Sequence, residues 1–169
     1  MCSILCYAGK DVTKETMEGY LLKTKMRGPD AQQVVETEFG YLGFARLAIM
    51  GLTPVQRDGS WVICNGEIYG FRKIKKELEE RGYQFQSGSD CEVLLPLYEE
   101  YGLEMFSHLD AEYACVLYDH KSGKLIAARD QIGIRPLFYG YSKSGKIAFA
   151  SEAKNLIGWV DEVRAFPPG

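Results

Sequence analysis

Apolar runs and a helical repeat alternate along the first fifty residues. Residues 3–8 are apolar and are followed by Gly9, which predicts a short buried strand. A helix is expected from Asp11 or Thr13, because three large side chains recur at the spacing of one helix face: Met17, Tyr20 and Leu21. The turn sequence Arg27-Gly28-Pro29-Asp30 should end this part of the chain.

Extended chain is predicted next. Residues 33–38 and 41–50 each have the pattern of a strand, and the two are joined at Gly40. Residues 53–59 are interpreted as a loop, and residues 61–64 as the strand that follows it.

The middle of the chain predicts two helices. Residues 71–81 are amphipathic, with Lys and Glu opposite an apolar face formed by Phe71, Ile74 and Leu78. Ser89-Asp90-Cys91-Glu92 is a capping-box pattern in front of a helical stretch whose large apolar residues are Val93, Leu94, Leu97, Tyr98 and Tyr101. Pro96 lies inside this second helix, where a proline costs ~3 kcal/mol or kinks the backbone, and the sequence gives no reason for it.

The last third of the chain is rich in strands. Residues 113–119 and 124–129 predict one hairpin, residues 137–141 and 146–149 predict a second, and a short helix is expected at 151–157. Antiparallel strands with helices before, between and after them indicate an α+β layered sandwich.

Composition and charge narrow the function classes. The 169 residues suit one domain, and 46% hydrophobic with 25% charged residues is ordinary for a globular protein. A net charge of −3 without a Lys/Arg cluster argues against a nucleic-acid or anionic-membrane partner. No apolar run approaches the ~18 residues of a membrane span, and no signal peptide is recognised, so we expect a cytoplasmic protein.

The cysteine pattern argues against a metal site. Five cysteines are irregularly spaced without a Cys-x-x-Cys pair, and only two histidines accompany them, so we expect no metal. Three of the cysteines lie in apolar or strand-like stretches and are expected to be buried: Cys64, Cys91 and Cys115. Cys6 follows Cys2 by four residues, which leaves a regulatory disulfide between them as an alternative.

Cys2 is the first candidate for catalysis. If Met1 is removed, Cys2 carries a thiol and a free α-amine on the same Cα. An α-amine titrates near ~7.7–8.0, so at neutral pH much of it can accept a proton from the thiol. A small second residue also simply favours removal of Met1, so its position alone does not establish a nucleophile.

Seven short motifs occur in order along the chain and carry a resemblance. They are Met1-Cys2-Ser3-Ile4, Arg27-Gly28-Pro29-Asp30, Arg46-Leu47, Asn65-Gly66-Glu67-Ile68-Tyr69, Gly88-Ser89-Asp90-Cys91-Glu92, residues 129–137 and Ala150-Ser151-Glu152-Ala153-Lys154. Together the motifs resemble the N-terminal glutaminase domain of class II glutamine amidotransferases. The likeness is greatest to the glutaminase domain of glutamine-hydrolysing asparagine synthetases.

The resemblance implies both a fold and a reaction. The fold is that of the N-terminal-nucleophile hydrolases, a four-layer αββα sandwich of two antiparallel sheets between helices. The reaction is hydrolysis of L-glutamine to glutamate and ammonia through a thioester on Cys2. The ammonia would pass to a synthetase domain that amidates aspartate with ATP, and the resemblance also allows a homodimer.

The resemblance also implies the remaining site residues. The Asn65 side-chain amide and the Gly66 backbone N–H would form the oxyanion hole, although Asn-Gly is also the strongest hairpin-turn signal. Arg46 would bind the α-carboxylate of glutamine, and Glu67 and Asp90 its α-ammonium group. Taken alone, Arg46 and Glu67 suit solvent-facing positions, and Asp90 suits a helix cap.

Residues 129–137 are rich in charge, Gly and Pro but are interpreted as structural. We expect Gly133 and Pro136 to shape a loop between strands, and Arg129 and Asp130 to form an ion pair.

The chain shows no phosphate-binding loop, so no cofactor is expected in this domain. ATP and Mg²⁺ would belong to a C-terminal synthetase domain that is absent here, and residues 1–169 would be the glutaminase domain of a longer enzyme. Two alternatives remain. The domain could serve another acceptor, as in amidophosphoribosyltransferases or hexosamine-phosphate synthases, or it could be a non-catalytic regulatory module of the same fold.

Overall fold

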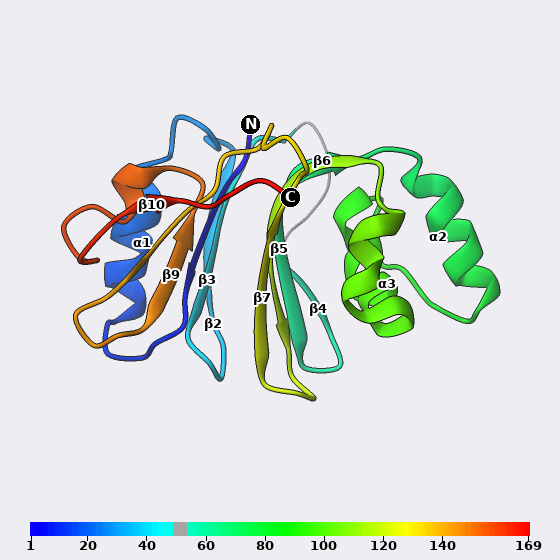
Figure 1. Ribbon diagram of the computed structural model, residues 1–169, viewed down its shortest axis with the longest axis horizontal. Helices are drawn as coiled ribbons and strands as arrows, with labels where there is room; N and C mark the ends of the chain where they lie inside the picture. The colour runs from blue at the N-terminus through cyan, green and yellow to red at the C-terminus, as the bar shows by residue number, and fades with distance from the viewer. Residues whose placement is uncertain (49–53) are drawn as a thin grey trace.

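Two β-sheets face each other at the centre of the molecule, with helices on both outer sides (Figure 1). The computed structural model describes residues 1–48 and 54–169. Helix α1 (Lys14–Leu22) covers the outer face of the first sheet, and helices α2 (Phe71–Glu80) and α3 (Leu94–Tyr101) cover that of the second. The predicted α+β sandwich with αββα layers is therefore confirmed.

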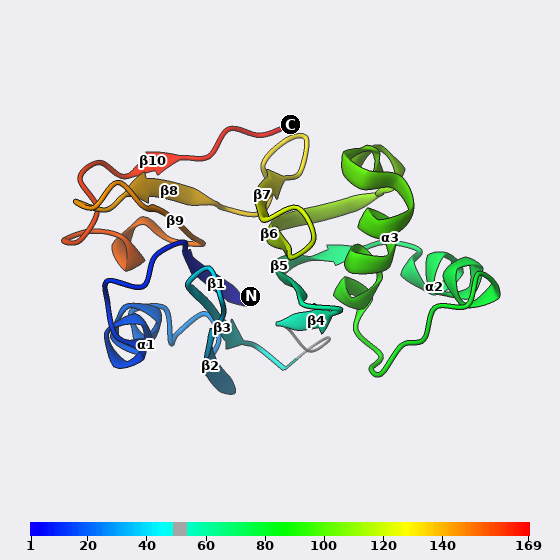
Figure 2. The same cartoon turned by 90° about the horizontal axis from the view of Figure 1, so that it is seen from below.

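The first sheet is antiparallel and has the strand order β10-β8-β9-β1-β3-β2 (Figure 2). Its strands are β1 (Ser3–Tyr7), β2 (Ala31–Glu36), β3 (Tyr41–Arg46), β8 (Phe138–Tyr141), β9 (Ile147–Ala150) and β10 (Arg164–Ala165). Strand β1 lies inside the sheet, with Ser3 opposite Ala45 of β3 and Leu5 opposite Ala150 of β9. The N-terminal strand is thus held on both sides.

The second sheet is also antiparallel, in the order β4-β5-β6-β7. Its strands are β4 (Val55–Arg57), β5 (Ser60–Ile68), β6 (Ala111–Asp119) and β7 (Lys124–Arg129). The hairpin of β6 and β7 confirms the prediction, and β5 extends four residues beyond the predicted strand 61–64. The predicted loop at 53–59 is wrong where β4 forms. The predicted strand 41–50 ends at Arg46, and its last two positions lie outside the described residues.

Pro96 is explained by its place in α3. A 3₁₀ helix (Asp90–Val93) precedes α3, so Pro96 is the third α-helical residue. Backbone N–H groups in a first helical turn have no intrahelical partner, so proline loses nothing there.

The predicted capping box at residues 89–92 is wrong. Ser89 makes no side-chain cap bond, and the Glu92 carboxylate instead accepts from the backbone N–H groups of Gln86 (2.5 Å) and Ser87 (2.9 Å). The remaining helical pieces are 3₁₀ turns at Gly102–His108 and Ala153–Asn155, the second replacing the predicted helix 151–157. No helix in the described part of the chain is long and apolar enough to cross a membrane.

Side chains of β1 alternate between two apolar cores. Ile4 and Cys6 point between the sheets, where they pack with Phe44 and Ile63, among others. Leu5 and Tyr7 belong to the core under α1. A third core separates the second sheet from α2 and α3. Because of this alternation, every second residue along a strand faces the space between the two sheets, and at the end of a strand we call this space the gap.

The loop between β7 and β8 is organised by Asp130. Its buried carboxylate accepts from the backbone N–H groups of Tyr113 (3.3 Å), Ile134 (2.7 Å) and Arg135 (3.0 Å). Burial acts to raise the pKa of Asp130, but these hydrogen bonds outweigh burial and the pKa is lowered.

Arg129 serves the same loop without pairing with its neighbour. Its guanidinium donates to three carbonyl oxygens, those of Gly133 (2.7 Å), Arg135 (2.6 Å) and Phe166 (2.8 Å). The loop-shaping role predicted for this segment is therefore confirmed. The predicted ion pair between Arg129 and Asp130 is wrong, because both side chains are used by backbone groups.

Asp130→Asn should lower the free energy of unfolding by about 1–3 kcal/mol, because it weakens a buried charged acceptor of three N–H groups. The lowered pKa means that Asp130 stabilises the fold above its unfolded pKa of about 3.9, and that this stability is lost as pH falls through the folded value. Urea unfolding between about pH 7 and pH 2 should therefore converge for the two proteins in acid. Exposed Asp161→Asn is the control, and curves that stay parallel in acid would refute this role.

Candidate active site

Cys2 lies at the start of β1, at the end of the sandwich where the N-terminus emerges (Figure 1). Its Sγ is 3.4 Å from the backbone nitrogen of Leu47 and 3.7 Å from the carbonyl oxygen of the same residue. All five cysteines are free, and Cys2 is the one that is not buried. Burial raises the pKa of the Cys6 thiol, and raises that of Cys115 to about 12, so these are poor nucleophiles.

The alternative of a Cys2–Cys6 disulfide is excluded by strand geometry. Four residues of extended chain span ~13 Å, whereas the Cα atoms of a disulfide lie less than ~7 Å apart. Cys6 is fully buried between the sheets. The predicted burial of Cys64, Cys91 and Cys115 is confirmed.

Arg46 is the neighbour of Cys2 on β3. Ser3 pairs with Ala45, so the next position in register places Arg46 beside Cys2. Leu42 and Phe44 pack between the sheets, and alternation directs Arg46 into the same gap. The Nε atom of Arg46 is buried and has no acceptor among the described residues. The solvent-facing alternative is therefore wrong for this arginine.

Asn65 faces the same gap from the opposite sheet. Ile63 packs between the sheets, and Asn65 lies two residues further along β5. Its side chain is only 2% exposed, and Nδ2 has no acceptor in the described part of the chain. The hairpin-turn alternative is wrong, because Asn65 and Gly66 both lie within β5, paired with Ala114 and Tyr113.

The backbone N–H of Gly66 points away from β6. Its partner Tyr113 donates to Asp130 Oδ2 and accepts from the Asp130 N–H, and so directs both backbone groups away from β5. In an antiparallel ladder Gly66 then directs its own groups to the other edge of β5. Strand β4 pairs only with residues 60–62 and does not reach this position.

No larger residue fits at Gly66. A Cβ built there would lie 2.4 Å from the carbonyl oxygen of Glu112 on the adjacent strand, closer than real Cβ atoms approach. The missing side chain therefore lets the Gly66 backbone lie close against β6.

Asp90 lies at the edge of β5 to which the Gly66 N–H points. Its Oδ2 accepts from the backbone N–H of Ile68 at 2.8 Å, and the side chain is 2% exposed. Ile68 is two residues beyond Gly66, so the two N–H groups point to the same side. Glu67 is exposed and lies opposite Glu112 in register. Asp90 starts a 3₁₀ helix without serving as a cap.

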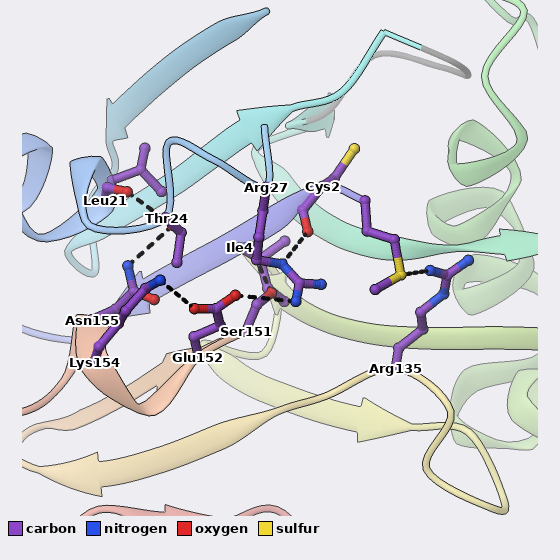
Figure 3. A network of polar contacts seen from close by, with 11 residues as sticks. Cys2, Ile4, Leu21, Thr24, Arg27, Arg135, Ser151, Glu152, Lys154 and Asn155 are labelled. Atoms are coloured by element: carbon purple, nitrogen blue, oxygen red, sulfur yellow. Dashed lines mark hydrogen bonds and ion pairs between the residues drawn. The ribbon is translucent and has the colours of Figure 1, made fainter. Parts of the chain in front are cut away.

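Arg27 was not singled out from the sequence, although it belongs to one of the quoted motifs. Its Nε donates to the Cys2 carbonyl oxygen at 3.1 Å, and its Nη1 contacts Glu152 Oε1 at 3.2 Å (Figure 3). Burial acts to raise the pKa of Glu152, but Lys154 and Arg27 outweigh burial and lower the pKa. Ser151 Oγ accepts from the Ile4 N–H at 2.9 Å. This network fixes the backbone at the start of β1.

The chemistry available at this end of the molecule is that of acyl transfer. A half-exposed thiol faces a gap that also receives the Arg46 side chain, with its buried Nε, from the adjacent strand and the buried Asn65 amide from the other sheet. A carboxylate lies on the adjoining edge of β5. Among the described residues, no cluster of three His, Cys, Asp or Glu side chains could hold a metal ion.

Sequence comparison supports the same reading of the motifs. The chain is 43% identical to the "Probable asparagine synthetase [glutamine-hydrolyzing]" of Acanthamoeba polyphaga mimivirus, over 99% of this chain and 33% of that protein. It is 38% identical to "Asparagine synthetase B [glutamine-hydrolyzing]" of Escherichia coli, over 85% of this chain and 27% of that protein. The chain thus spans about a third of the length of these curated relatives.

Structural comparison shows the fold. The glutamine phosphoribosylpyrophosphate amidotransferase of B. subtilis, complexed with ADP and GMP, superposes with a TM-score of 0.84 at 21% identity, covering 100% of this chain and 46% of that chain. The family model described as "Glutamine amidotransferase domain" matches residues 1–165. This match covers nearly the whole chain, and the chain therefore belongs to the glutamine amidotransferase domain family.

Proposed function

We propose that this chain hydrolyses L-glutamine to glutamate and ammonia, with Cys2 as the nucleophile. The observation that carries the proposal is the meeting of three groups at one end of the sandwich. They are the half-exposed Cys2 thiol, the Arg46 guanidinium with its buried Nε, and the buried Asn65 amide, whose Nδ2 has no acceptor among the described residues.

Removal of Met1 would supply the base. The Cys2 amine would take the thiol proton as Sγ attacks the side-chain carbonyl of glutamine, and the proton would then pass to the departing ammonia. The oxyanion would be held by Asn65 Nδ2 and the Gly66 N–H, since one such donor contributes about 2.7–4 kcal/mol in other enzymes. Water would then hydrolyse the thioester and release glutamate.

Recognition of free glutamine needs a cation and an anion. Arg46 would bind the α-carboxylate in a bidentate manner, as guanidinium groups do. Asp90, with one oxygen already bound to the Ile68 N–H, and the exposed Glu67 would bind the α-ammonium group.

The ammonia acceptor is a further part of the proposal. Because the relatives named above are asparagine synthetases, we propose that a C-terminal synthetase domain uses the ammonia to amidate aspartate, and that ATP and Mg²⁺ bind only there. An acceptor of the amidophosphoribosyltransferase or hexosamine-phosphate synthase type is the alternative. A cytoplasmic location and a homodimer are expected for the same enzyme.

The N-terminal amine and thiol can be tested together. Intact-mass measurement should show active protein that lacks Met1, and an uncleaved N-terminal extension should abolish glutamate release because the α-amine is then blocked. Cys2→Ala should also abolish glutamate release with little change in melting temperature. Cys115→Ala, which removes a buried thiol from the core between the second sheet and its helices, should keep the activity. Full activity with the extension in place would contradict the role of the amine.

Substrate binding and transition-state stabilisation should separate by mutation. Arg46→Ala removes a contact made in both states, so KM should rise at least tenfold with a smaller change in kcat. Asn65→Ala removes an oxyanion donor, so kcat should fall about 10²–10³-fold with KM less affected. The control is Arg57→Ala, which breaks the pair with Glu99 on the helical side. Identical patterns in the two test variants would show that the roles are not separate.

The acceptor is tested by the products. The 169 residues alone should release glutamate and ammonia in equal amounts and form no asparagine when aspartate and ATP are added. A full-length protein with a synthetase domain should form asparagine from the same mixture. If the full-length protein forms another amidated product, the glutaminase activity stands but the acceptor is not aspartate. If the 169 residues alone form asparagine, a second domain is not required.

A further inference from the structure

An ion pair that the proposed hydrolysis does not use lies beside the N-terminal end of β1. Arg135 Nη2 donates to Glu112 Oε1 at 2.5 Å, and the two side chains are only 13% and 19% exposed. The other terminal nitrogen, Nη1, donates to the Met1 thioether sulfur (Figure 3). One guanidinium thus lies between a carboxylate and the residue that precedes Cys2.

Both members of the pair are held in place. The Arg135 N–H donates to Asp130 Oδ2 at 3.0 Å, and its carbonyl oxygen accepts from Arg129 Nε at 2.6 Å. Glu112 lies within β6, opposite Glu67 of β5. The backbone from which each of the two side chains extends is therefore fixed.

Removal of Met1 changes what Arg135 contacts. The thioether, a weak acceptor, leaves, and a charged amine appears on Cys2, the next residue in the chain. Glu112 lies on the other side of the guanidinium. Without Arg135, Glu112 would lose the one ion-pair partner that it has among the described residues.

We propose that Arg135 is a positioning residue that occupies Glu112 and so keeps this carboxylate from binding the Cys2 amine as its ammonium. The proposal rests on the proposed function, in which the amine acts as the base. An ammonium group held by a carboxylate cannot accept a proton, and the contact would also draw the amine away from Sγ.

Other charged and titratable groups surround the same end of β1. They are Asp30 just before β2, Arg46 of β3, Glu67 of β5, Tyr69 just after β5, and the pair Arg27 and Glu152. Arg27 is paired with Glu152, and Asp30 accepts from the Ala48 N–H at 2.6 Å. Neither contact involves Arg135 or Glu112, so replacing Arg135 removes no partner from Arg27, Glu152 or Asp30.

The test is the titration of the α-amine of residue 2 in the Met1-free chain, without glutamine. All variants carry Cys2→Ala for this measurement, because a thiol at position 2 would take up the acetyl group and pass it to the amine. Trace labelling with acetic anhydride across pH is then read by mass spectrometry of the N-terminal peptide. Arg135→Met should raise the amine pKa by about one pH unit, because it leaves Glu112 facing the ammonium group. The double variant Arg135→Met/Glu112→Gln should return the pKa close to that of the parent chain.

Two further variants keep the outcome decisive. Glu112→Gln alone should lower the amine pKa, since an unpaired guanidinium disfavours a nearby ammonium group, and it serves as the test if Arg135→Met does not fold. Arg164→Met, which breaks an exposed pair with Glu162, should leave the titration unchanged. No shift in Arg135→Met, or an upward shift in Glu112→Gln, would overturn the proposal. Absence of glutamine hydrolysis in the parent chain would instead overturn the proposed function.

Discussion

The alternation of side chains along β1, β3 and β5 is the constraint on which the candidate site depends. Cys2, Arg46 and Asn65 each lie at an even spacing from a residue packed between the sheets, namely Ile4, Phe44 and Ile63. A slip of one residue in any of these strands would turn its site residue toward a helical layer. The interlocking apolar core between the sheets therefore also fixes the register of the site.

Buried donors without partners cost stability and indicate where a ligand belongs. Leaving a buried polar group unpaired costs about 1–3 kcal/mol. Asn65 Nδ2 and Arg46 Nε are two such groups among the described residues, and both belong to the same gap. Arg27 Nη2 is also buried without a partner, but the other nitrogens of this side chain bind the Cys2 carbonyl and Glu152 and so hold the backbone of β1. Donors that are held in place and left unpaired can stabilise the negative charge that develops in a transition state.

Much of the fold could be predicted from local patterns, and the failures have physical causes. The β6–β7 hairpin follows from alternation across a turn at residues 120–123. Strand β4 has only three residues, which is too few for the alternation of a strand to be recognised from sequence, and it forms by pairing with β5. Glu92 bonds to Gln86 and Ser87 instead of Ser89, because the chain before the 3₁₀ helix folds back onto it.

The candidate site residues that belong to sequence motifs could be predicted, whereas contacts that only the tertiary structure creates could not. The structure places Cys2, Arg46 and Asn65 around one gap, and Asp90 on the adjoining edge of β5. The Arg135–Glu112 pair joins residues 23 positions apart, and no spacing rule connects them.

The most direct measurement is a crystal structure of the chain inactivated with a glutamine-like diazoketone. We expect one adduct, on Cys2 Sγ, with its ketone oxygen within hydrogen-bond distance of Asn65 Nδ2 and the Gly66 nitrogen. An adduct on another residue, or a ketone oxygen turned away from both donors, would contradict the site described here.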